Sequence, residues 1–330
     1  MTTSADSVAG ARAAGQRLPD FFIVGQSKSG TTALYEILRE HPQIYMPIVK
    51  EPVFMASDHH SGLWSTVPTR PRTLADYLAL FDDAGSEQQA GEASSVYLWS
   101  REAAANIAAL QPAARIIAIF REPASFLRSL HLQMLQNHVE VVKDFEKALE
   151  LESARRVGKR IPRRCPWPQA LLYSERIRYV EQLCRYRAMF RPENVLVLIY
   201  DDFRADNERT VRQVLRFLQV DDTVPLRVWE ANPTVRLRSK QLDELIHGAS
   251  VGRGPVMNGV KAGIKAVTSR RLRHSVLRRR GALVYGEPRP PDEQLMLELR
   301  RRFKGEVKAF GEYTGRDLVK LWGYDNVTPS

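Results

Sequence analysis

Phe21-Phe-Ile-Val-Gly-Gln-Ser-Lys-Ser-Gly-Thr-Thr32 is the stretch of sequence that decides the fold. It begins with four consecutive apolar residues, which is typical of a strand buried on both faces of a sheet. The apolar run stops at Gly25, and after Gly30 the apolar residues recur at helical spacing. The stretch therefore predicts a strand, a glycine loop and a helix in direct succession.

Two more apolar runs, at 115–120 and 195–200, predict buried strands that are each followed by a helix. Strands that alternate with helices favour a parallel sheet, because the connection between parallel strands crosses one of its faces. The expected fold is α/β: a P-loop-like three-layer arrangement with a central parallel sheet flanked by helices. Its other helices are expected near 73–82, 101–110, 141–157, 173–190, 207–218 and 291–313.

The chain has no stretch that would act as a linker between two domains. We expect a flexible tail over 1–18 and a single domain over 19–330, with loop insertions near 57–72, 136–170 and 250–285. The segments 57–72 and 158–170 are rich in Pro, His, Arg and Trp. Long loops over an α/β sheet usually serve the binding site, so we expect these two to do so.

Composition limits the class of protein. The 330 residues are 44% hydrophobic and 26% charged, which excludes disordered and fibrous proteins. No apolar run approaches the ~18–20 residues that span a bilayer, and residues 1–16 lack the apolar region of a secretory signal. Cys165 and Cys184 fit neither a disulfide scaffold nor a zinc pattern. We therefore expect a reduced, cytoplasmic protein.

Positive charge is concentrated in one segment. The formal net charge is +11, and residues 236–280 hold twelve Lys and Arg against Asp243 and Glu244. Such a segment indicates an anionic partner, whether a phosphorylated ligand, a membrane surface or a nucleic acid. For 261–280 we weigh a solvated helix face against contact with an acidic acceptor or with the anionic inner face of the membrane. Nucleic acid is not expected, because no aromatic residues are interleaved with the charges.

The glycine loop predicts an anion site, because free N–H groups and the helix dipole meet at the start of a helix. In loops that bind nucleoside triphosphates a lysine follows the second glycine, but here Thr31 stands in that position and the lysine is Lys28. The second strand ends at Arg121, where a magnesium-binding aspartate would be expected. Such a site is poorly suited to γ-phosphoryl transfer.

Several motifs together resemble one known family. Lys28-Ser-Gly-Thr-Thr32 is similar to the 5′-phosphosulfate loop of sulfotransferases that use 3′-phosphoadenosine 5′-phosphosulfate (PAPS). Arg121-Glu-Pro-Ala-Ser-Phe-Leu-Arg-Ser129 is similar to that family's 3′-phosphate signature, and Tyr200-Asp-Asp-Phe to the turn whose tyrosine lies beside the nucleotide. With Phe217-Leu-Gln-Val220 and the closing Thr314-to-Trp322 stretch, the resemblance runs from about residue 20 to 323.

The resemblance implies PAPS as co-substrate and no metal. It implies that the donor is bound by Lys28, Ser29, Gly30, Thr31, Thr32, Arg121, Ser129 and Tyr200. Two features depart from the family pattern. Ala33 stands where many members carry an adenine-stacking tryptophan, and the Arg-Lys-Gly element of animal cytosolic members is missing. Arg236, Arg238 or Lys240 could replace that element.

Sulfuryl transfer is an in-line displacement that needs positioning, charge stabilisation on the leaving oxygen and a base for the acceptor hydroxyl. Lys28 is the natural stabiliser. Lys50-Glu51-Pro-Val-Phe54 resembles an element of glycan and bacterial sulfotransferases whose glutamate acts as base, so Glu51 is the predicted base. Its rivals are Glu92, which is alternatively a structural carboxylate, and His59 and His60, which are alternatively solvated. Lys50, His59, His60 and Glu92 are also candidate acceptor-binding residues.

The sequence thus predicts an enzyme that moves a sulfuryl group from PAPS to a hydroxyl of a glycan, glycolipid or secondary-metabolite acceptor. Two alternatives stay open at this point. One is a P-loop kinase or NTPase-like enzyme, against which Thr31 argues. The other is a non-catalytic protein that binds a membrane or nucleic acid through its basic segment.

Overall fold

The architecture is known from a computed structural model, which describes residues 15–60, 70–163, 165, 167–226 and 290–328 and the backbone of 236–237 and 285–286. Five parallel strands form the central sheet in the order β2-β3-β1-β4-β5. Their bounds are Phe21–Gly25 for β1, Ile44–Tyr45 for β2, Gln89–Ala93 for β3, Arg115–Phe120 for β4 and Val195–Ile199 for β5. The predicted α/β fold with a central parallel sheet is confirmed.

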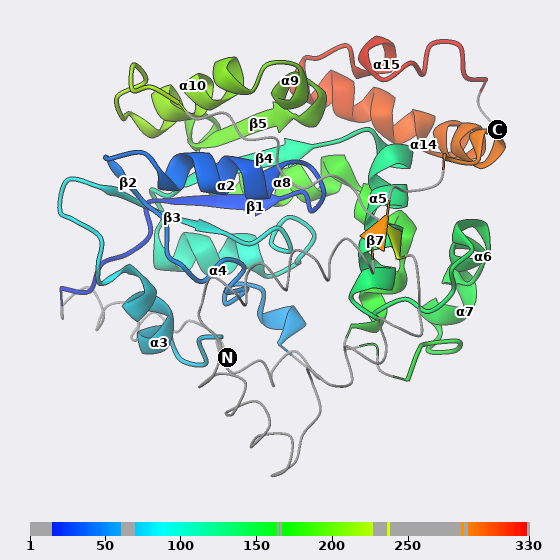
Figure 1. The fold of residues 1–330 in the computed structure, drawn as a ribbon, viewed down its shortest axis with the longest axis horizontal. Helices are drawn as coiled ribbons and strands as arrows, with labels where there is room; N and C mark the ends of the chain where they lie inside the picture. The colour runs from blue at the N-terminus through cyan, green and yellow to red at the C-terminus, as the bar shows by residue number, and fades with distance from the viewer. Residues whose placement is uncertain are drawn as a thin grey trace.

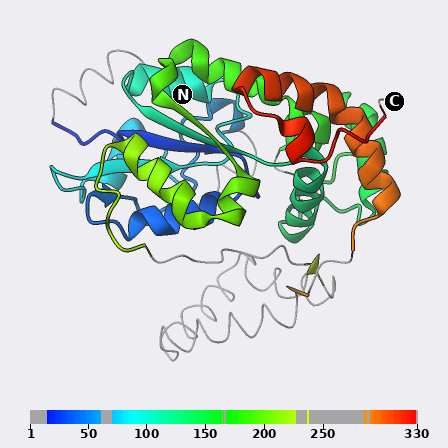
Figure 2. The same cartoon turned by 90° about the horizontal axis from the view of Figure 1, so that it is seen from above.

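Helices cover both faces of the sheet, which gives three layers (Figures 1 and 2). Along β1 the side chains alternate, so Phe21 and Ile23 pack into one core and Phe22 and Val24 into the other. The first core is closed by α2 (Thr31–Arg39) and α10 (Asn207–Leu218). The second, larger core is closed by α4 (Ala103–Leu110), α5 (Pro123–Gln136), α8 (Tyr179–Met189) and α14 (Glu293–Thr314).

The remaining elements are short. The helices are α3 (Leu74–Leu78), α6 (Phe145–Glu150), α7 (Glu152–Arg156), α9 (Tyr200–Ala205) and α15 (Leu318–Leu321). Single 3-10 turns lie at Ser57–His59, Ala79–Phe81, Pro168–Leu171, Tyr173–Ile177 and Pro192–Asn194. Two-residue strands β6 (Arg236–Leu237) and β7 (Tyr285–Gly286) pair antiparallel.

Most predicted elements are present with small changes in extent. The strands at 21–24, 115–120 and 195–200 are confirmed as β1, β4 and β5, and the helix at 207–218 is α10. The helix expected over 141–157 is divided into α6 and α7, which meet at Leu151. The single domain over 19–330 stays a prediction, and the insertion expected near 250–285 lies outside the described residues apart from β7.

Strand order fixes where a ligand can bind. From β1 the chain runs to the sheet edge at β2, returns to β3 beside β1, and then continues to β4 on the other side of β1. Connections from neighbouring strands therefore diverge at the carboxyl end of β1, and α/β sheets bind ligands at such a switch point. The glycine loop leaves β1 at this point and leads into α2.

Candidate active site

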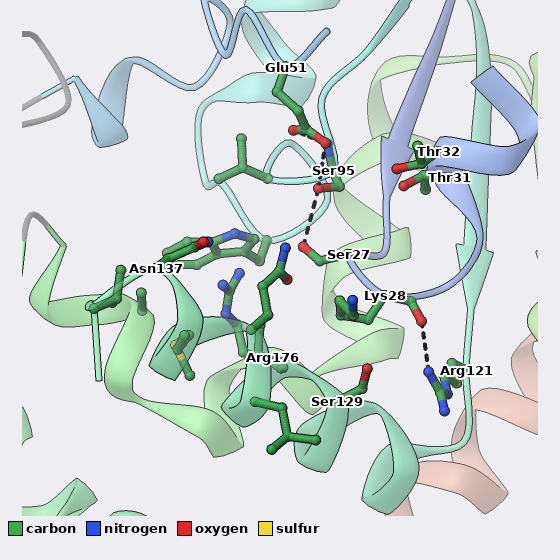
Figure 3. A pocket seen from close by; sticks show the side chains of 18 of the residues that line it. Ser27, Lys28, Thr31, Thr32, Glu51, Ser95, Arg121, Ser129, Asn137 and Arg176 are labelled. Atoms are coloured by element: carbon green, nitrogen blue, oxygen red, sulfur yellow. Dashed lines mark hydrogen bonds between the residues drawn. The ribbon is translucent and has the colours of Figure 1, made fainter. Parts of the chain in front are cut away.

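A cavity of about 550 Å³ lies at the carboxyl ends of β1, β3 and β4. It takes residues from the glycine loop, from the segment around Glu51, from the turn after β3 and from α5 (Figure 3). The predicted site residues that line it are Lys28, Gly30, Thr31, Thr32, Lys50, Glu51, Arg121, Ser129 and Tyr200. The structure thus brings together the predicted donor-binding residues and the predicted base.

The glycine loop is shaped by backbone conformation. Gly30 adopts φ +84° as the N-cap of α2 and leaves no room for a side chain, since a Cβ there would lie 2.8 Å from the Phe203 ring. Lys28 is also left-handed, with φ +61°, a conformation that costs a non-glycine residue of order 1–3 kcal/mol and is concentrated at functional sites. The Ser29 side chain is fully buried and donates to Ser27 O at 3.4 Å. Ser29 is therefore the one residue of the predicted donor-binding set that does not line the cavity.

Cationic groups gather around the loop. Arg121 follows β4, and its Nη1 donates to Lys28 O at 2.9 Å while its guanidinium lies 4.8 Å from the centre of the Tyr200 ring. Burial, and then repulsion from Arg121, lowers the pKa of Lys28. Burial likewise lowers the pKa of Arg121. Among the described residues neither group has a carboxylate within ion-pair distance, so this wall of the cavity suits a phosphate or sulfate.

The carboxyl-terminal elements support the Tyr200 side of this wall. Trp322 Nε1 donates to Asp201 Oδ2 at 2.9 Å, and Arg316 forms an ion pair with Asp202 at 3.0 Å. Both carboxylates belong to the first turn of α9, directly after Tyr200. The closing stretch that the sequence singled out therefore anchors α9, and with it the aromatic ring beneath Arg121.

Glu51 lies on the opposite wall, held by the turn that follows β3. Its backbone N–H donates to Ala93 O at 3.1 Å, and its φ of +59° is again left-handed. Ser95 donates twice to the carboxylate, from N to Oε2 at 2.9 Å and from Oγ to Oε1 at 3.0 Å. Lys50 Nζ donates to Oε1 at 3.0 Å. A carboxylate accepts about four hydrogen bonds, so these three donors orient it and leave room for a further hydroxyl.

Glu92 and the two histidines are placed differently. Glu92 is fully buried outside the cavity lining, where it accepts hydrogen bonds from Tyr77 at 3.0 Å and Tyr97 at 2.7 Å. Burial raises its pKa to about 7. His59 is buried against Trp99, with ring centres 4.1 Å apart, and burial lowers its pKa to about 4. His60 Nε2 lies 3.0 Å from Val53 O. The structure does not bring these three candidate residues to the cavity surface.

Several lining residues were not predicted. Ser27 and Ser95 face each other, with their Oγ atoms 3.2 Å apart (Figure 3). Trp99, Asn137 and Arg176 line the cavity as well. Trp167 and Ala170 line it too, so the 158–170 segment reaches the cavity, and its role in binding stays a prediction. Residues 61–69 lie outside the described part of the chain. The only sequence signal for Ser95 was its place after Glu92, and Arg176 had none.

Within the described ranges, no group of three or more His, Cys, Asp or Glu is arranged to hold a metal ion. None of the helices in these ranges is long and apolar enough to cross a membrane.

The fold and the site define an α/β protein with an anion-binding glycine loop that faces a carboxylate across one cavity. A family model described as the sulfotransferase domain matches residues 18–242. The match covers more than half of the chain, and the chain therefore belongs to the sulfotransferase family.

Individual relatives agree with this assignment. The chain is 27% identical to mouse carbohydrate sulfotransferase 15 over 247 residues, which cover 62% of this chain and 44% of the relative. It is 30% identical to mouse heparan sulfate glucosamine 3-O-sulfotransferase 3B1 over 129 residues, 39% of this chain and 30% of the relative. The chain thus spans less than half the length of these curated relatives. The crystal structure of a sulfotransferase from Alicyclobacillus acidocaldarius shares the fold, with a TM-score of 0.64 and 22% identity over 93% of this chain and 99% of that one.

Proposed function

We propose that the protein transfers the sulfuryl group of PAPS to a hydroxyl of an acceptor. One observation carries the proposal: Lys28 and Glu51, the predicted stabiliser and the predicted base, line the same cavity from opposite walls. Family membership supports it, since the sulfotransferase family uses PAPS. A cavity with a cationic wall and a carboxylate wall can hold an anionic donor and a neutral nucleophile side by side.

The residues on the cationic wall fit the donor. PAPS carries a 5′-phosphosulfate and a separate 3′-phosphate, so it needs two anion sites. The glycine loop with Lys28 supplies N–H groups and an ammonium for the first. Arg121 and Ser129 supply a fork of fixed charge and a hydroxyl for the second. The mutual repulsion of Lys28 and Arg121 is relieved when an anion is bound between or beside them.

When bound, PAPS supplies an activated sulfuryl group and a stable leaving group, 3′,5′-ADP. Lys28 then stabilises the negative charge that develops on the leaving oxygen, and its buried position strengthens that interaction. Glu51, oriented by Ser95 and Lys50, accepts the proton of the acceptor hydroxyl. Glu92 is already engaged by two tyrosines outside the cavity, and His59 is stacked and buried, so Glu51 is the better placed base.

The acceptor is proposed as a glycan, glycolipid or secondary metabolite. The named relatives are carbohydrate and heparan sulfate sulfotransferases, which favours a sugar hydroxyl within this range. A cytoplasmic location stays a prediction of the sequence, as does membrane contact through 261–280, since that segment lies outside the described residues. A kinase or NTPase is not favoured, because Thr31 stands at the lysine position of the loop and Arg121 at the end of β4.

Nucleotide selectivity tests the proposal most directly. We expect 3′,5′-ADP to raise the melting temperature, because a ligand that binds only the native state stabilises it by mass action. ATP with magnesium should do little, and 5′-AMP should do less than 3′,5′-ADP. Incubation with PAPS and a mixture of hydroxyl compounds should then give products heavier by one SO₃, as measured by mass spectrometry. Stabilisation by ATP with magnesium alone would contradict the assignment.

A further inference from the structure

Arg176 stands out among the buried charges of the molecule. It is 8% exposed, its Nε has no hydrogen-bond partner, and no carboxylate lies within ion-pair distance of it among the described residues. Arg155 is buried to a similar degree, 3% exposed, but forms two hydrogen bonds to Glu140 at 2.6 and 2.9 Å. Buried charges in proteins are normally paired in the way that Arg155 is. The missing partner of Arg176 therefore needs an explanation.

The surroundings of Arg176 hold it in place without neutralising it. Its guanidinium lies 3.7 Å from the centre of the Trp99 ring, a cation–π contact. His59 also contacts Trp99, with ring centres 4.1 Å apart, and burial lowers the pKa of His59 to about 4, so that it adds no charge at neutral pH. The Arg176 carbonyl accepts from the Gln26 and Gln182 amides, each at 3.2 Å. Burial lowers the pKa of Arg176 to about 9, which leaves it charged near pH 7.

Arg176 lines the cavity beside the start of the glycine loop and the turn that follows β3. A small pocket at this place is lined by Gln26 and Ser27 of the loop, by Ser95 and Trp99 of the turn, and by Arg176. Ser95 donates twice to Glu51, and Lys28 and Arg121 lie on the other side of Ser27 (Figure 3). A molecule whose hydroxyl reaches Glu51 can therefore place another part of itself against Arg176.

We propose that Arg176 binds an oxyanion of the acceptor, so that the substrate class is an acidic hydroxyl compound, carrying a carboxylate or an ester of phosphate or sulfate beside the hydroxyl that reacts. A guanidinium carries its N–H donors in a planar fork, which can bind a carboxylate or phosphate group with two hydrogen bonds. The acceptor then supplies the oxyanion that none of the described residues offers to Arg176. This inference rests on the proposed function, and it adds a recognition residue on the acceptor side.

The test compares an acid with its own ester on protein saturated with 3′,5′-ADP. The probes are methyl glucuronoside and its methyl ester, and 4-hydroxybenzoate and its methyl ester, measured by titration calorimetry. We expect at least one acid to bind about tenfold or more tightly than its ester, the scale of one charged hydrogen bond. Equal binding of acid and ester in both pairs, or no binding of any probe, would overturn the proposal. Phosphate and sulfate esters of the same sugar then decide which oxyanion is preferred.

Variants test whether Arg176 is the source of the preference for the acid over its ester. Arg176→Gln should abolish the preference for the acid, and Arg176→Lys should keep part of it, since an ammonium is charged but lacks the fork. Arg187→Gln is the matched control, because Arg187 also stacks on an aromatic ring, 4.6 Å from the centre of Tyr313, and does not line the cavity. An acid preference that survives in Arg176→Gln would overturn the proposal.

Different results would refute the proposed function and the acceptor role of Arg176. If 3′,5′-ADP does not stabilise even the unmodified protein, the proposed function fails. If Arg176→Gln keeps its affinity for 3′,5′-ADP and loses only the acid preference, both hold. If Arg176→Gln loses 3′,5′-ADP affinity as strongly as acid binding while Arg176→Lys melts at the temperature of the unmodified protein, Arg176 belongs to the donor site and the acceptor role is wrong.

Discussion

The two walls of the cavity are built in different ways. The donor wall comes mainly from one short stretch, 27–32, in which backbone turn, lysine and helix start are neighbours in sequence, completed by Arg121 at the end of the adjacent strand. The acceptor wall joins Glu51, Ser95, Trp99 and Arg176, which three separate segments contribute. A wall assembled from distant segments can change one residue at a time without altering the glycine loop. If the proposed function is right, we therefore expect acceptor specificity to depend on this wall.

The charges of the two walls differ as well. The donor wall holds two cations whose pKa values are both lowered by burial and which have no carboxylate within ion-pair distance among the described residues. The acceptor wall holds a carboxylate oriented by three donors and, apart from it, a guanidinium supported by an indole. The donor wall is suited to binding a polyanion. The acceptor wall is suited to removing a proton and to recognising one further group. Substitutions on each wall should therefore change different measured quantities.

The largest effect is expected on the acceptor wall, at Glu51. Glu51→Gln keeps the shape and removes the basic group. Its single amide oxygen can replace only one of the two carboxylate oxygens to which Ser95 N–H and Ser95 Oγ donate. A general base contributes typically ~10²–10⁴-fold, so kcat should fall by about that range. Affinity for 3′,5′-ADP and the melting temperature should change little, because Glu51 lies on the wall away from the donor. Steady-state kinetics and thermal melts of the same preparation measure both.

Glu92→Gln is the control for this prediction. Glu92 is buried among tyrosine hydroxyls outside the cavity, so its replacement should alter stability more than turnover. An active Glu51→Gln together with a stable but inactive Glu92→Gln would move the base to Glu92. If both variants are active and only His59 or His60 variants are inactive, no carboxylate is the base.

On the donor wall, Lys28→Ala should affect turnover more than binding. Charge on the leaving oxygen develops mainly in the transition state, so the lysine contributes most there. Removal of one such preorganised group costs on the order of 10²–10³-fold in kcat. The loss of 3′,5′-ADP affinity, measured by calorimetry, should be clearly smaller. A variant that loses affinity and retains kcat would make Lys28 an anchor for the phosphate and nothing more.

Stability should depend on pH through Glu92. The pKa of Glu92 is raised from 4.5 to about 7 in the folded protein, so between these values the folded state holds a proton that the unfolded chain releases. The free energy of unfolding should therefore fall as the pH rises from about 4.5 to 7, by roughly 3 kcal/mol from this group. Urea unfolding at pH 5 and 7.5 should show this loss in the unmodified protein and in Glu51→Gln. Glu92→Gln should lack it, and identical pH profiles of all three would refute the assignment.

The strands that consist of continuous apolar residues could be predicted from the sequence. β1, β4 and β5 are continuous apolar segments, and each was found from its sequence. β3 was not, because Gln89-Ala-Gly-Glu-Ala93 lacks any bulky apolar side chain. Its composition follows from packing, since a Cβ at Gly91 would lie 2.1 Å from Phe21 Cζ. Because β3 consists of small residues that fit against the side chain of its neighbour, it lacks the apolar pattern by which a strand is found in a sequence.

The site was predictable on the donor wall and, on the acceptor wall, at Lys50 and Glu51. Lys28, Arg121 and Ser129 belong to motifs with fixed spacing, and all three line the cavity. Arg176 is 150 residues from Gln26, whose side chain donates to its carbonyl, and no local pattern reports such a contact. Its defining feature is that no carboxylate of the described residues lies within ion-pair distance of it, which is a property of the packed structure. Sequence motifs thus identify the residues of the donor wall. On the acceptor wall, Ser95, Trp99 and Arg176 become evident only in the structure.

The smallest expected effect separates the two anion sites of the donor wall. Arg121→Ala should weaken 3′,5′-ADP binding by about 1.5–3 kcal/mol, the scale of a hydrogen bond to a charged group. The substitution also removes the repulsion that lowers the pKa of Lys28 and the hydrogen bond from Arg121 to Lys28 O. Loss of the repulsion favours the charged form of Lys28, whereas loss of the hydrogen bond loosens the glycine loop. These two indirect effects on the affinity for 3′,5′-ADP therefore oppose each other.

The affinities for two nucleotides separate the direct contact between Arg121 and the 3′-phosphate from these indirect effects. Both indirect effects act through the glycine loop, and they should change the affinity for 5′-AMP and for 3′,5′-ADP alike. A contact between Arg121 and the 3′-phosphate changes only the latter. We therefore expect calorimetry to show that Arg121→Ala narrows the preference for 3′,5′-ADP over 5′-AMP, because the variant loses the charge that recognises the additional phosphate. An unchanged preference with an equal loss for both nucleotides would place Arg121 at the 5′ end of the donor.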